Sequence, residues 1–312
     1  MRRARSGGLR VAILGDPAGW HVGRLRTTLT GRGHQATVVR WSELAAEVGM
    51  AASSPAAAGG ERFRPGAVDA ADVVLVRSMP GGGLEEIIFR MDLLGRLAAR
   101  GTPVVNSPRG LEIAIDKYLC LTRLAAAGLP VPRTIVAQDR ATIFAAWESF
   151  AGDCIAKPLF GSQGRGLVRL ADRAAIDATI AGVSDRGPEG AVTYLQEFVP
   201  HHGWDVRVLV IGDRSISIRR IAAGDDWRTN VSCGGHPEAF DAPEEWVGLA
   251  KRAAEAVGTD LAGVDLLPAR DGRLLVLEVN AVPGWRGLES ATGVDVSDAV
   301  VGHLETLPAP TA

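Results

Sequence analysis

The sequence has little cysteine, and the few cysteines are scattered. Its 312 residues include Cys120, Cys154 and Cys233, and no two of them form a Cys-x-x-Cys pair. An odd and widely spaced set of cysteines argues against a disulfide framework and against a structural zinc site. Reduced thiols of this kind are typical of the cytosol, so we expect a cytoplasmic protein.

Other absences narrow the class of protein. No apolar run is long enough to cross a membrane, and no signal-peptide core follows the basic start MRRARSGGLR. The net charge of −2 and the pI near 6.3 give no electrostatic footprint for nucleic acid. A hydrophobic content of 46% with 22% charged residues is ordinary for a globular enzyme. We therefore expect neither a membrane nor a nucleic acid as partner.

Lysine is also scarce. Of 34 basic residues, only Lys117, Lys157 and Lys251 are lysines. A solvated surface charge can be either lysine or arginine, whereas a site that needs a compact ammonium cannot use a planar guanidinium. Lys251 falls in an amphipathic helix and is expected at the surface, so Lys117 and Lys157 are the candidates for a binding site.

The first hundred residues alternate strands and helices. Apolar strands are expected at 10–14, 36–41, 73–77 and 103–106, and helices at 21–32 and 84–100. This alternation is typical of a doubly wound α/β domain, which we place at residues 9–108 after a flexible tail, residues 1–8. Residues 51–60 have the composition of a flexible loop. The first strand does not lead into G-x-G-x-x-G, which argues against dinucleotide binding.

After residue 108 the pattern of predicted strands and helices changes, and residues 109–307 are expected to form a second domain. One helix is expected over 111–127, followed by strands, helices and an antiparallel set of strands. The pattern predicts two α+β lobes, at about 109–188 and 189–307. A helix at 243–257 precedes a final hairpin, AGVDLLPARDGRLLVLEVN.

That hairpin contains the first candidate site. A symmetric loop centred on Asp271-Gly272 would place Asp265 opposite Glu278, with Asn280 on the same face. Two facing carboxylates repel each other, and burial without partners would cost several kcal/mol more. A hard cation such as Mg²⁺ would relieve both problems. The alternative is a solvated hairpin whose acids face water, and its apolar neighbours argue against that alternative.

Two further stretches suggest a phosphate ligand and a base. In KPLFGSQGRG a strand delivers Lys157, and Gly164 is one of three glycines that would let the backbone approach phosphates. An ordinary glycine-rich hairpin turn is the alternative. The stretch QEFVPHHGWDVR at 196–207 would suit a purine and its ribose, or equally an edge strand with a charged rim. We expect its two histidines in a solvated loop rather than on a metal.

These stretches together resemble the RimK-like ATP-grasp ligases. The matching motifs are DK at 116–117, KPLFGSQGRG, QEF with DVRVLVIG, WRTN at 227–230, GVDLL at 263–267 and LEVNAVPGW. The likeness spans nearly the whole chain, and RSMPGGGLEEIIFRMD at 77–92 is most similar to the glutamate ligases of tetrahydromethanopterin biosynthesis. It implies a pre-ATP-grasp, Rossmann-like α/β domain followed by a two-lobed α+β ATP-grasp domain.

The resemblance also implies roles for individual residues. ATP would lie between the lobes, its phosphates near Lys117, Lys157 and Gly164, its adenine at Glu197 and Phe198, and its ribose at Asp205. Its triphosphate end would meet Arg228, Thr229 and Asn230, and catalysis would depend on Arg207, Arg220 and Asn230. Two Mg²⁺ or Mn²⁺ ions would be bound by Asp265, Glu278 and Asn280. One departure is Cys233, because family members often have a basic residue there, and this leaves acceptor recognition open.

The expected function is therefore an ATP-dependent carboxylate–amine ligase. It would add L-glutamate to a small-molecule acceptor through an acyl phosphate, the acceptor being a pterin cofactor precursor. Alternatives are glutamylation of a protein C-terminus such as that of a ribosomal protein, a phosphotransferase, and an inactive nucleotide-sensing module. The intact acidic set counts against the last of these. A homo-oligomer is compatible with all of them, and no motif of a serine hydrolase, zinc protease or kinase is present.

Overall fold

The computed structural model describes residues 7–49, 61–161, 166–184, 192–224 and 226–310. The predicted loop 51–60, most of the predicted tail and Gly164 lie outside these ranges. No helix in the described ranges is both long and apolar enough to span a bilayer.

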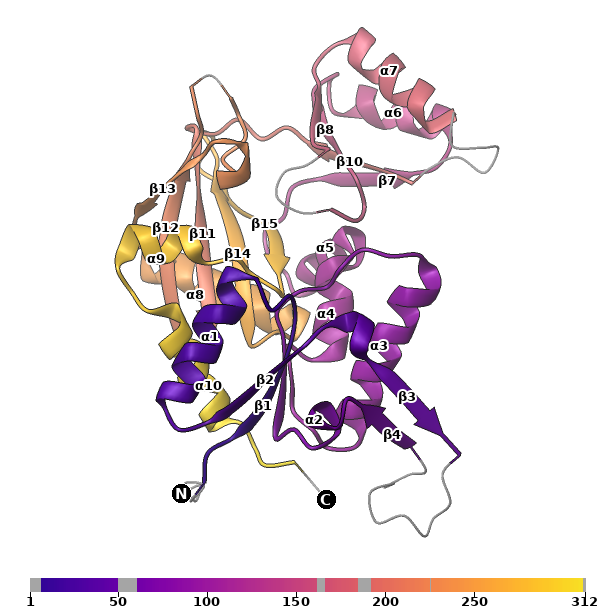
Figure 1. The fold of residues 1–312 in the computed structure, drawn as a ribbon. Helices are drawn as coiled ribbons and strands as arrows, with labels where there is room; N and C mark the ends of the chain where they lie inside the picture. The colour runs from indigo at the N-terminus through magenta and orange to yellow at the C-terminus, as the bar shows by residue number, and fades with distance from the viewer. Residues whose placement is uncertain (1–6, 50–60, 162–165, 185–191, 225, 311–312) are drawn as a thin grey trace.

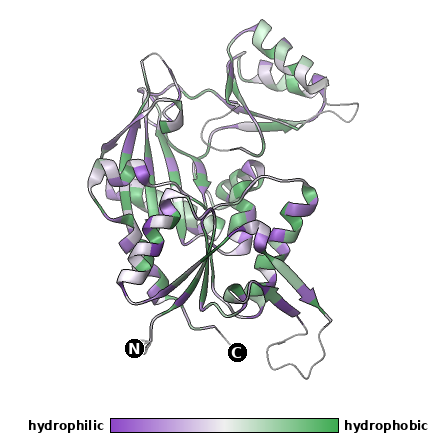
Figure 2. Ribbon diagram, in the orientation of Figure 1, coloured by the Kyte–Doolittle hydropathy of each residue, from purple (hydrophilic) through white to green (hydrophobic). Residues whose placement is uncertain are grey.

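The N-terminal region is built on a parallel sheet. Its strand order is β2 (Gln35–Val39), β1 (Arg10–Leu14), β5 (Val73–Val76) and β6 (Val104–Val105). The helices α1 (Trp20–Gly31) and α3 (Leu84–Ala99) connect these strands. All of β5 and all of β1 after its first residue are buried, as expected of parallel strands covered on both faces. Figure 2 shows the hydrophobic colouring of the central strands of this sheet. The strands and helices lie within a residue or two of the predicted positions.

A small addition to this region was not predicted. It consists of the antiparallel pair β3 (Ala45–Val48) and β4 (Glu61–Arg64), followed by the short helix α2 (Gly66–Asp69). The predicted loop at 51–60 lies between these two strands, and four-residue strands give little periodic signal.

The predicted helix 111–127 is wrong in one respect, because the structure has two helices there. They are α4 (Pro108–Ile115) and α5 (Lys117–Ala126). The break is at Asp116, whose carboxylate accepts hydrogen bonds from the backbone N–H groups of Tyr118 at 2.8 Å and Leu119 at 3.0 Å. Asp116 therefore acts as an N-cap, and it makes Lys117 the first residue of α5.

The first lobe is an antiparallel sheet covered by two helices. Its strand order is β7 (Thr134–Ala137), β10 (Thr193–Glu197), β8 (Cys154–Lys157) and β9 (Val168–Leu170). The helices α6 (Arg140–Ser149) and α7 (Arg173–Ser184) cover one face and share a small apolar core with the sheet (Figure 1).

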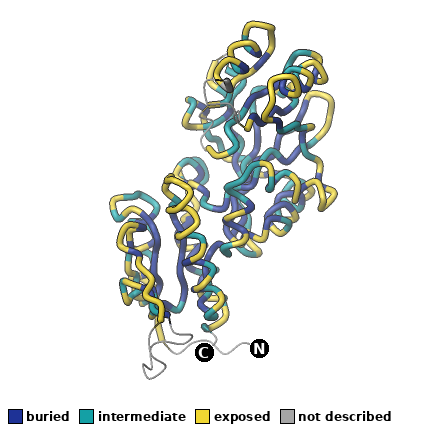
Figure 3. The backbone as a smooth tube through the Cα atoms, turned by 90° about the vertical axis from the view of Figure 1, so that its right-hand side faces the viewer, coloured by how far each residue is buried: buried dark blue, intermediate teal, exposed yellow. Residues whose placement is uncertain are grey.

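The second lobe contains a five-stranded antiparallel sheet. Its strand order is β13 (His236–Ala239), β12 (Arg214–Ile221), β11 (Trp204–Ile211), β14 (Leu261–Pro268) and β15 (Leu274–Asn280). Helix α8 (Glu244–Val257) packs on one face, where its buried side forms a core with the central strands. Figure 3 shows the buried residues following the strands, with the exposed residues on the outer sides of the helices.

The chain ends with two helices that were not predicted, α9 (Arg286–Thr292) and α10 (Val296–Thr306). Helix α10 lies against α1 of the N-terminal region (Figure 1), and Leu25 and Leu29 share a core with Val300 and Leu304. Arg32 reinforces this contact through ion pairs with Asp298 and Glu305 of α10, both at 2.6 Å. The C-terminal end of the second lobe is thus part of the N-terminal core.

The final hairpin has the predicted facing pair but not the predicted register. Asp265 lies opposite Glu278, yet between that pair and the turn the register is shifted by one residue. The turn is tighter than the symmetric loop that was expected, because the backbone N–H of Ala269 already bonds to the carbonyl of Arg273 at 2.8 Å. A bulge at Leu277 compensates for this offset. The acidic pair was therefore predicted correctly from a register that was wrong near the turn.

Candidate active site

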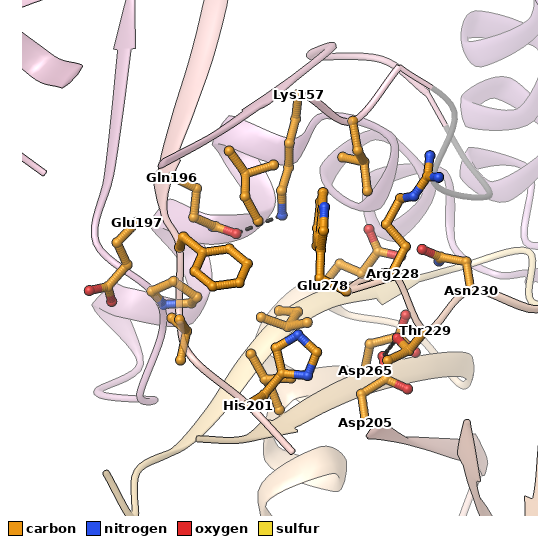
Figure 4. Close-up of a pocket in the computed structure, with 18 of the residues that line it drawn as sticks. Lys157, Gln196, Glu197, His201, Asp205, Arg228, Thr229, Asn230, Asp265 and Glu278 are labelled. Carbon is orange, nitrogen blue, oxygen red and sulfur yellow. Dashed lines mark hydrogen bonds between the residues drawn. The ribbon is translucent and has the colours of Figure 1, made fainter. Parts of the chain in front are cut away.

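A cleft between the two lobes gathers most of the predicted site residues. Together with the part that is open to solvent, it contains about 880 Å³ of space between protein atoms. Its lining contains residues from both lobes (Figure 4), including Lys117, Lys157, Glu197, Phe198, Asp205, Arg220, Arg228, Thr229, Asn230, Asp265 and Glu278. Arg207 and Asn280 do not line the cleft, but each bonds to an acid that does.

Two lysines enter the cleft from one side. Lys157 ends β8 and donates its Nζ proton to Gln196 Oε1 at 2.6 Å (Figure 4). Burial lowers the pKa of Lys157 to about 8, and the neighbouring carboxylate of Glu278 opposes that shift. Lys117 donates to the carbonyl oxygen of Gly161 at 2.5 Å, and burial lowers its pKa as well. Both ammonium groups are poorly solvated, so a polyanion would be a favourable partner for them.

Gln196 is a site residue that the sequence did not identify. Its side chain is buried, and its Nε2 group donates to Thr134 Oγ1 at 3.0 Å and to the hydroxyl of Tyr194 at 3.3 Å. These bonds turn its Oε1 toward Lys157, which can only donate. The quoted QEF stretch contained this residue, but its polar side chain gave no sign that it pointed inward.

One end of the cleft is apolar and aromatic. Ile155, Leu267 and Leu277 line it together with Phe198, and the ring of Phe198 meets Trp227 edge-on at 5.9 Å. A flat apolar slot of this kind suits a nucleobase.

Glu197 does not point into this slot. Its carboxylate accepts from the backbone N–H of Arg133 at 3.0 Å and from the Arg273 guanidinium at 3.2 Å. Figure 4 shows it directed away from the centre of the cleft. A contact between Glu197 and adenine would therefore involve its backbone rather than its carboxylate.

A chain of buried ion pairs crosses the floor of the cleft. Arg220 bonds to Asp205 at 2.8 and 2.5 Å and to Asp265 at 3.0 Å, and Arg207 bonds to Asp265 at 2.7 Å through two nitrogens. Burial alone would raise the pKa of Asp265, but the two arginines outweigh it and lower the pKa to about 2. Burial likewise opposes the charge on Arg220, and its two acids outweigh burial and raise its pKa.

This network corrects one part of the sequence argument. The repulsion between Asp265 and Glu278 was expected to need a cation, yet Arg207 and Arg220 already neutralise Asp265. No pattern in the sequence could have paired these residues, because Arg207 and Asp265 are 58 positions apart.

The geometry also bears on two other predicted roles. Asp205 is buried and accepts hydrogen bonds from Arg220 and from Thr229 Oγ1, the latter at 2.7 Å. That arrangement favours a positioning role, and the ribose contact stays a prediction. His201 was expected in a solvated loop, but it lines the cleft, while His202 is exposed.

The acidic end of the cleft fits a hard cation. Asn280 donates through Nδ2 to Glu278 Oε1 at 2.9 Å and to the carbonyl of Gly263 at 3.4 Å. Both bonds use the amide nitrogen, so the amide oxygen is the atom left to bind a cation. With two carboxylates nearby, the donor set contains oxygen atoms and no sulfur or imidazole, as Mg²⁺ prefers. Within the described ranges, no three His, Cys, Asp or Glu residues are grouped so that they could hold a metal ion. The set proposed here has two carboxylates, and its third donor is the amide of Asn280.

The stretch Arg228–Asn230 borders the same end. Arg228 pairs with Asp226 at 2.8 Å, and Gly235 packs so closely that an added Cβ would lie 2.2 Å from the carbonyl oxygen of Thr229. The preceding Gly234 has a φ of 92°, a conformation that favours glycine. This tight turn holds Asn230 at the cleft. Cys233 lies within the turn and is partly exposed.

Comparison with known proteins identifies relatives over most of the chain. A family model described as RimK-like ATP-grasp domain matches residues 114–304. The tetrahydromethanopterin:alpha-L-glutamate ligase of Methanosarcina acetivorans is 32% identical over 76% of this chain and 80% of its own. A probable alpha-L-glutamate ligase of Mannheimia succiniciproducens is 35% identical over 73% of this chain and 75% of its own.

Solved structures give the same picture. The ATP-grasp ligase PsnB, complexed with a minimal precursor, has a TM-score of 0.73 and 26% identity over 95% of this chain and 99% of its own. PsnB has also been solved with a variant precursor, Mg and ADP, at a TM-score of 0.72. A RimK domain protein from Sphaerobacter thermophilus has a TM-score of 0.71 and 27% identity over 94% of this chain and 98% of its own.

Proposed function

Because this chain belongs to the RimK-like ATP-grasp family and is a ligase that forms carbon–nitrogen bonds, we propose that it joins L-glutamate to an acceptor carboxylate at the expense of ATP. The names of its relatives support glutamate as the amine. Three relatives named tetrahydromethanopterin:alpha-L-glutamate ligase support a pterin-type acceptor.

One observation carries the proposal. The cleft sets Lys117 and Lys157 across from Asp265 and Glu278, and no serine or cysteine is among its described lining residues. Cations and acidic oxygens facing each other across a gap suit a nucleotide held together with Mg²⁺. The absence of a serine or cysteine nucleophile from these described residues suits chemistry in which the protein forms no covalent bond to substrate.

The reaction proposed for this site has two steps. An acceptor carboxylate oxygen attacks the γ-phosphorus of ATP, and ADP leaves with the electron pair of the broken bond. The amine nitrogen then attacks the carbonyl carbon of the acyl phosphate, inorganic phosphate leaves, and the nitrogen loses a proton. Negative charge lies on phosphoryl oxygens in both steps, so positioned cations supply the catalysis.

The residues present can fill the roles that this chemistry requires. We assign the phosphates of ATP to Lys117 and Lys157 and the triphosphate end to Arg228, Thr229 and Asn230. Asp265, Glu278 and Asn280 would hold Mg²⁺, which would supply positive charge at the phosphoryl oxygens. Arg220 lines the cleft and Arg207 does not, so Arg220 is the better placed of the two to meet the acyl phosphate.

A peptide or protein acceptor is the second candidate. PsnB, whose fold covers nearly the whole of this chain, has been solved with precursor peptides. The probable alpha-L-glutamate ligases among the relatives carry no acceptor in their names. A cleft open to solvent is compatible with either acceptor.

Mass spectrometry of reaction mixtures tests the proposal. Purified protein receives ATP, Mg²⁺ and L-glutamate with either a carboxylated pterin precursor or peptides that end in a free carboxylate. We expect one acceptor to gain glutamyl mass while ADP forms. A phosphorylated acceptor without glutamate would indicate a phosphotransferase, and nucleotide binding without any product would indicate a sensing module. Both results would contradict the proposal.

A further inference from the structure

The segment that follows the acidic strand is held by the N-terminal region, and the proposed chemistry makes no use of these contacts. We call residues 281–285 the strap. It begins directly after Asn280 and ends at the start of α9. Ala281, Pro283 and Trp285 are buried, and Trp285 is only 1% exposed.

Three side chains of the N-terminal region bind the backbone of the strap. Asn106 Nδ2 donates to the carbonyl of Ala281, and Arg77 Nη2 donates to the carbonyl of Pro283 at 2.8 Å. The backbone N–H of Trp285 donates to His21 Nε2 at 3.0 Å. The strap is therefore fixed at its beginning, middle and end.

These three side chains share one edge of the parallel sheet. Arg77 directly follows β5, Asn106 directly follows β6, and His21 lies in the helix that follows β1. They are thus at the carboxyl ends of the strands, where open α/β sheets usually hold a ligand. In this chain the strap occupies that edge, and Trp285 and Ala281 pack into two cores of the N-terminal region.

Asn106 also joins the two strands that carry the acidic residues. Its Oδ1 accepts from the backbone N–H groups of Asp260 and Leu261, both at 2.8 Å, and its Nδ2 donates to the carbonyls of Leu261 and Ala281. A primary amide can make two bonds of each kind, so its capacity is fully used. Leu261 begins β14 and Ala281 follows β15, so one buried side chain sets the relative position of both strands.

Arg77 is an expensive residue to bury. Its Nε and Nη1 atoms have no hydrogen-bond partner among the described residues, and its guanidinium lies over the Trp285 ring at 4.2 Å. Burial lowers its pKa to about 9. An apolar side chain could fill this space at a lower cost in folding free energy. The buried charge, and the hydrogen bond that it donates to the strap, therefore suggest a role other than stability.

We propose that Arg77 and Asn106 are positioning residues for the metal end of the cleft, holding Glu278 and Asn280 in place through the strap. The inference rests on the proposed function, because it takes those two residues as metal ligands. It gives the N-terminal region a part in the reaction, although none of its residues lines the cleft in the described structure.

Four variants test the proposal. Arg77→Met removes the donor to Pro283, and Arg77→Lys keeps a cation that can donate. Asn106→Asp keeps the shape of the side chain and removes both donors. Arg24→Met is the matched control, since Arg24 likewise joins the N-terminal region to the C-terminal residues, through Asp295 at 3.0 Å, but forms no hydrogen bond or ion pair with the strap among the described residues.

Three quantities are measured for each variant. They are the hydrogen exchange rate of the strap amides, the Kd of ADP without metal, and the Kd of Mn²⁺ for the protein–ADP complex by electron paramagnetic resonance. For Arg77→Met we expect at least tenfold faster exchange at Trp285 and at least fivefold weaker Mn²⁺ binding. The Kd of ADP should change less than twofold. Arg77→Lys should recover most of the loss, and Arg24→Met should match the wild type.

The outcomes separate this inference from the proposed function. If the wild-type protein binds neither ADP nor Mn²⁺, both the proposed function and this inference are wrong. Wild-type protein that binds both, with Arg77→Met unchanged in Mn²⁺ affinity, would overturn the positioning role alone. Equal losses of ADP and Mn²⁺ binding would also overturn it, because they would indicate general destabilisation. If Asn106→Asp fails to fold, the two Arg77 variants still decide the question.

Discussion

At the scale of single residues, nucleotide binding should depend most on the buried ammonium of Lys157. Its Nζ fits against Gln196 Oε1 at 2.6 Å, and a guanidinium is larger and planar. We expect Lys157→Arg to be nearly as damaging as Lys157→Ala in nucleotide affinity and turnover. Lys251→Arg is the matched control, because Lys251 donates only to the carbonyl of Asp213 at a partly exposed site. A Lys157→Arg variant within about threefold of wild type, or ~0.65 kcal/mol, would contradict the assignment.

The lowered pKa of Lys157 predicts how binding depends on pH. Its pKa is about 8 in the free protein, so above that pH the side chain loses its proton. A bound polyphosphate favours the charged form, so the nucleotide should bind with uptake of a proton near pH 8.5. Affinity should fall with rising pH above 8, by no more than about tenfold per pH unit. Calorimetry in two buffers of different ionisation enthalpy measures the number of protons taken up on binding. A wild-type protein that binds nucleotide without taking up a proton would refute the prediction.

Glu278 should matter for activity much more than for folding. Asp265 is already neutralised by Arg207 and Arg220, so Glu278→Gln removes one negative charge and leaves that network intact. We expect the free energy of unfolding without metal to stay level or to rise by roughly 0.2–1 kcal/mol. Mg²⁺-dependent turnover should collapse. Thermal unfolding checks the stability and initial rates check the turnover. If the variant unfolds several degrees earlier than the wild type without metal, Glu278 has a structural role and the prediction is wrong.

At the scale of secondary structure elements, the cap of α5 connects stability with binding. Asp116 bonds to the first turn of this helix, whose first residue is Lys117. Asp116→Ala should lower the free energy of unfolding by about 0.5–2 kcal/mol and weaken nucleotide binding. Asp116→Asn can still accept these bonds and should restore most of both. Chemical denaturation and ADP titration of the two variants provide the check, and equal losses would point to the charge instead of the cap.

Much of the fold was predictable because apolar periodicity identifies long elements. The strands β1, β2 and β5 and the helices α3 and α8 lie close to their predicted positions. The family resemblance inferred from six motifs is confirmed by the match over residues 114–304. The break at Asp116 was missed because a capping aspartate inside an apolar pattern looks like an exposed helical residue.

The parts of the site that could not be predicted depend on long-range contacts. Nothing in the sequence pairs Arg207 with Asp265 or turns Gln196 toward Lys157, because these bonds form only when separate strands meet. Asp265 was expected opposite Glu278 from a symmetric loop. The two residues do face each other, but only because an unpredicted bulge at Leu277 offsets the tighter turn.

At the scale of the whole molecule, the three parts of the chain are interlocked. The last helix completes the core of the N-terminal region, and the strap connects that region to the acidic strand. At the opposite end of the cleft, Arg273 of the final hairpin reaches Glu197 of the first lobe. The lobes meet at a cleft whose proposed phosphate and metal ends are supported by different parts of the chain.

The central claim is that the carboxylate is activated as an acyl phosphate, and one isotope measurement tests it most directly. An acceptor labelled with ¹⁸O in its carboxylate is converted with ATP, Mg²⁺ and L-glutamate, and the products are examined by mass spectrometry. The account predicts one ¹⁸O atom in inorganic phosphate for each amide formed, with ADP as the nucleotide product. Label in AMP would indicate an adenylate, and label retained in a phosphorylated acceptor would indicate phosphotransfer without ligation. Either of these results would contradict the account.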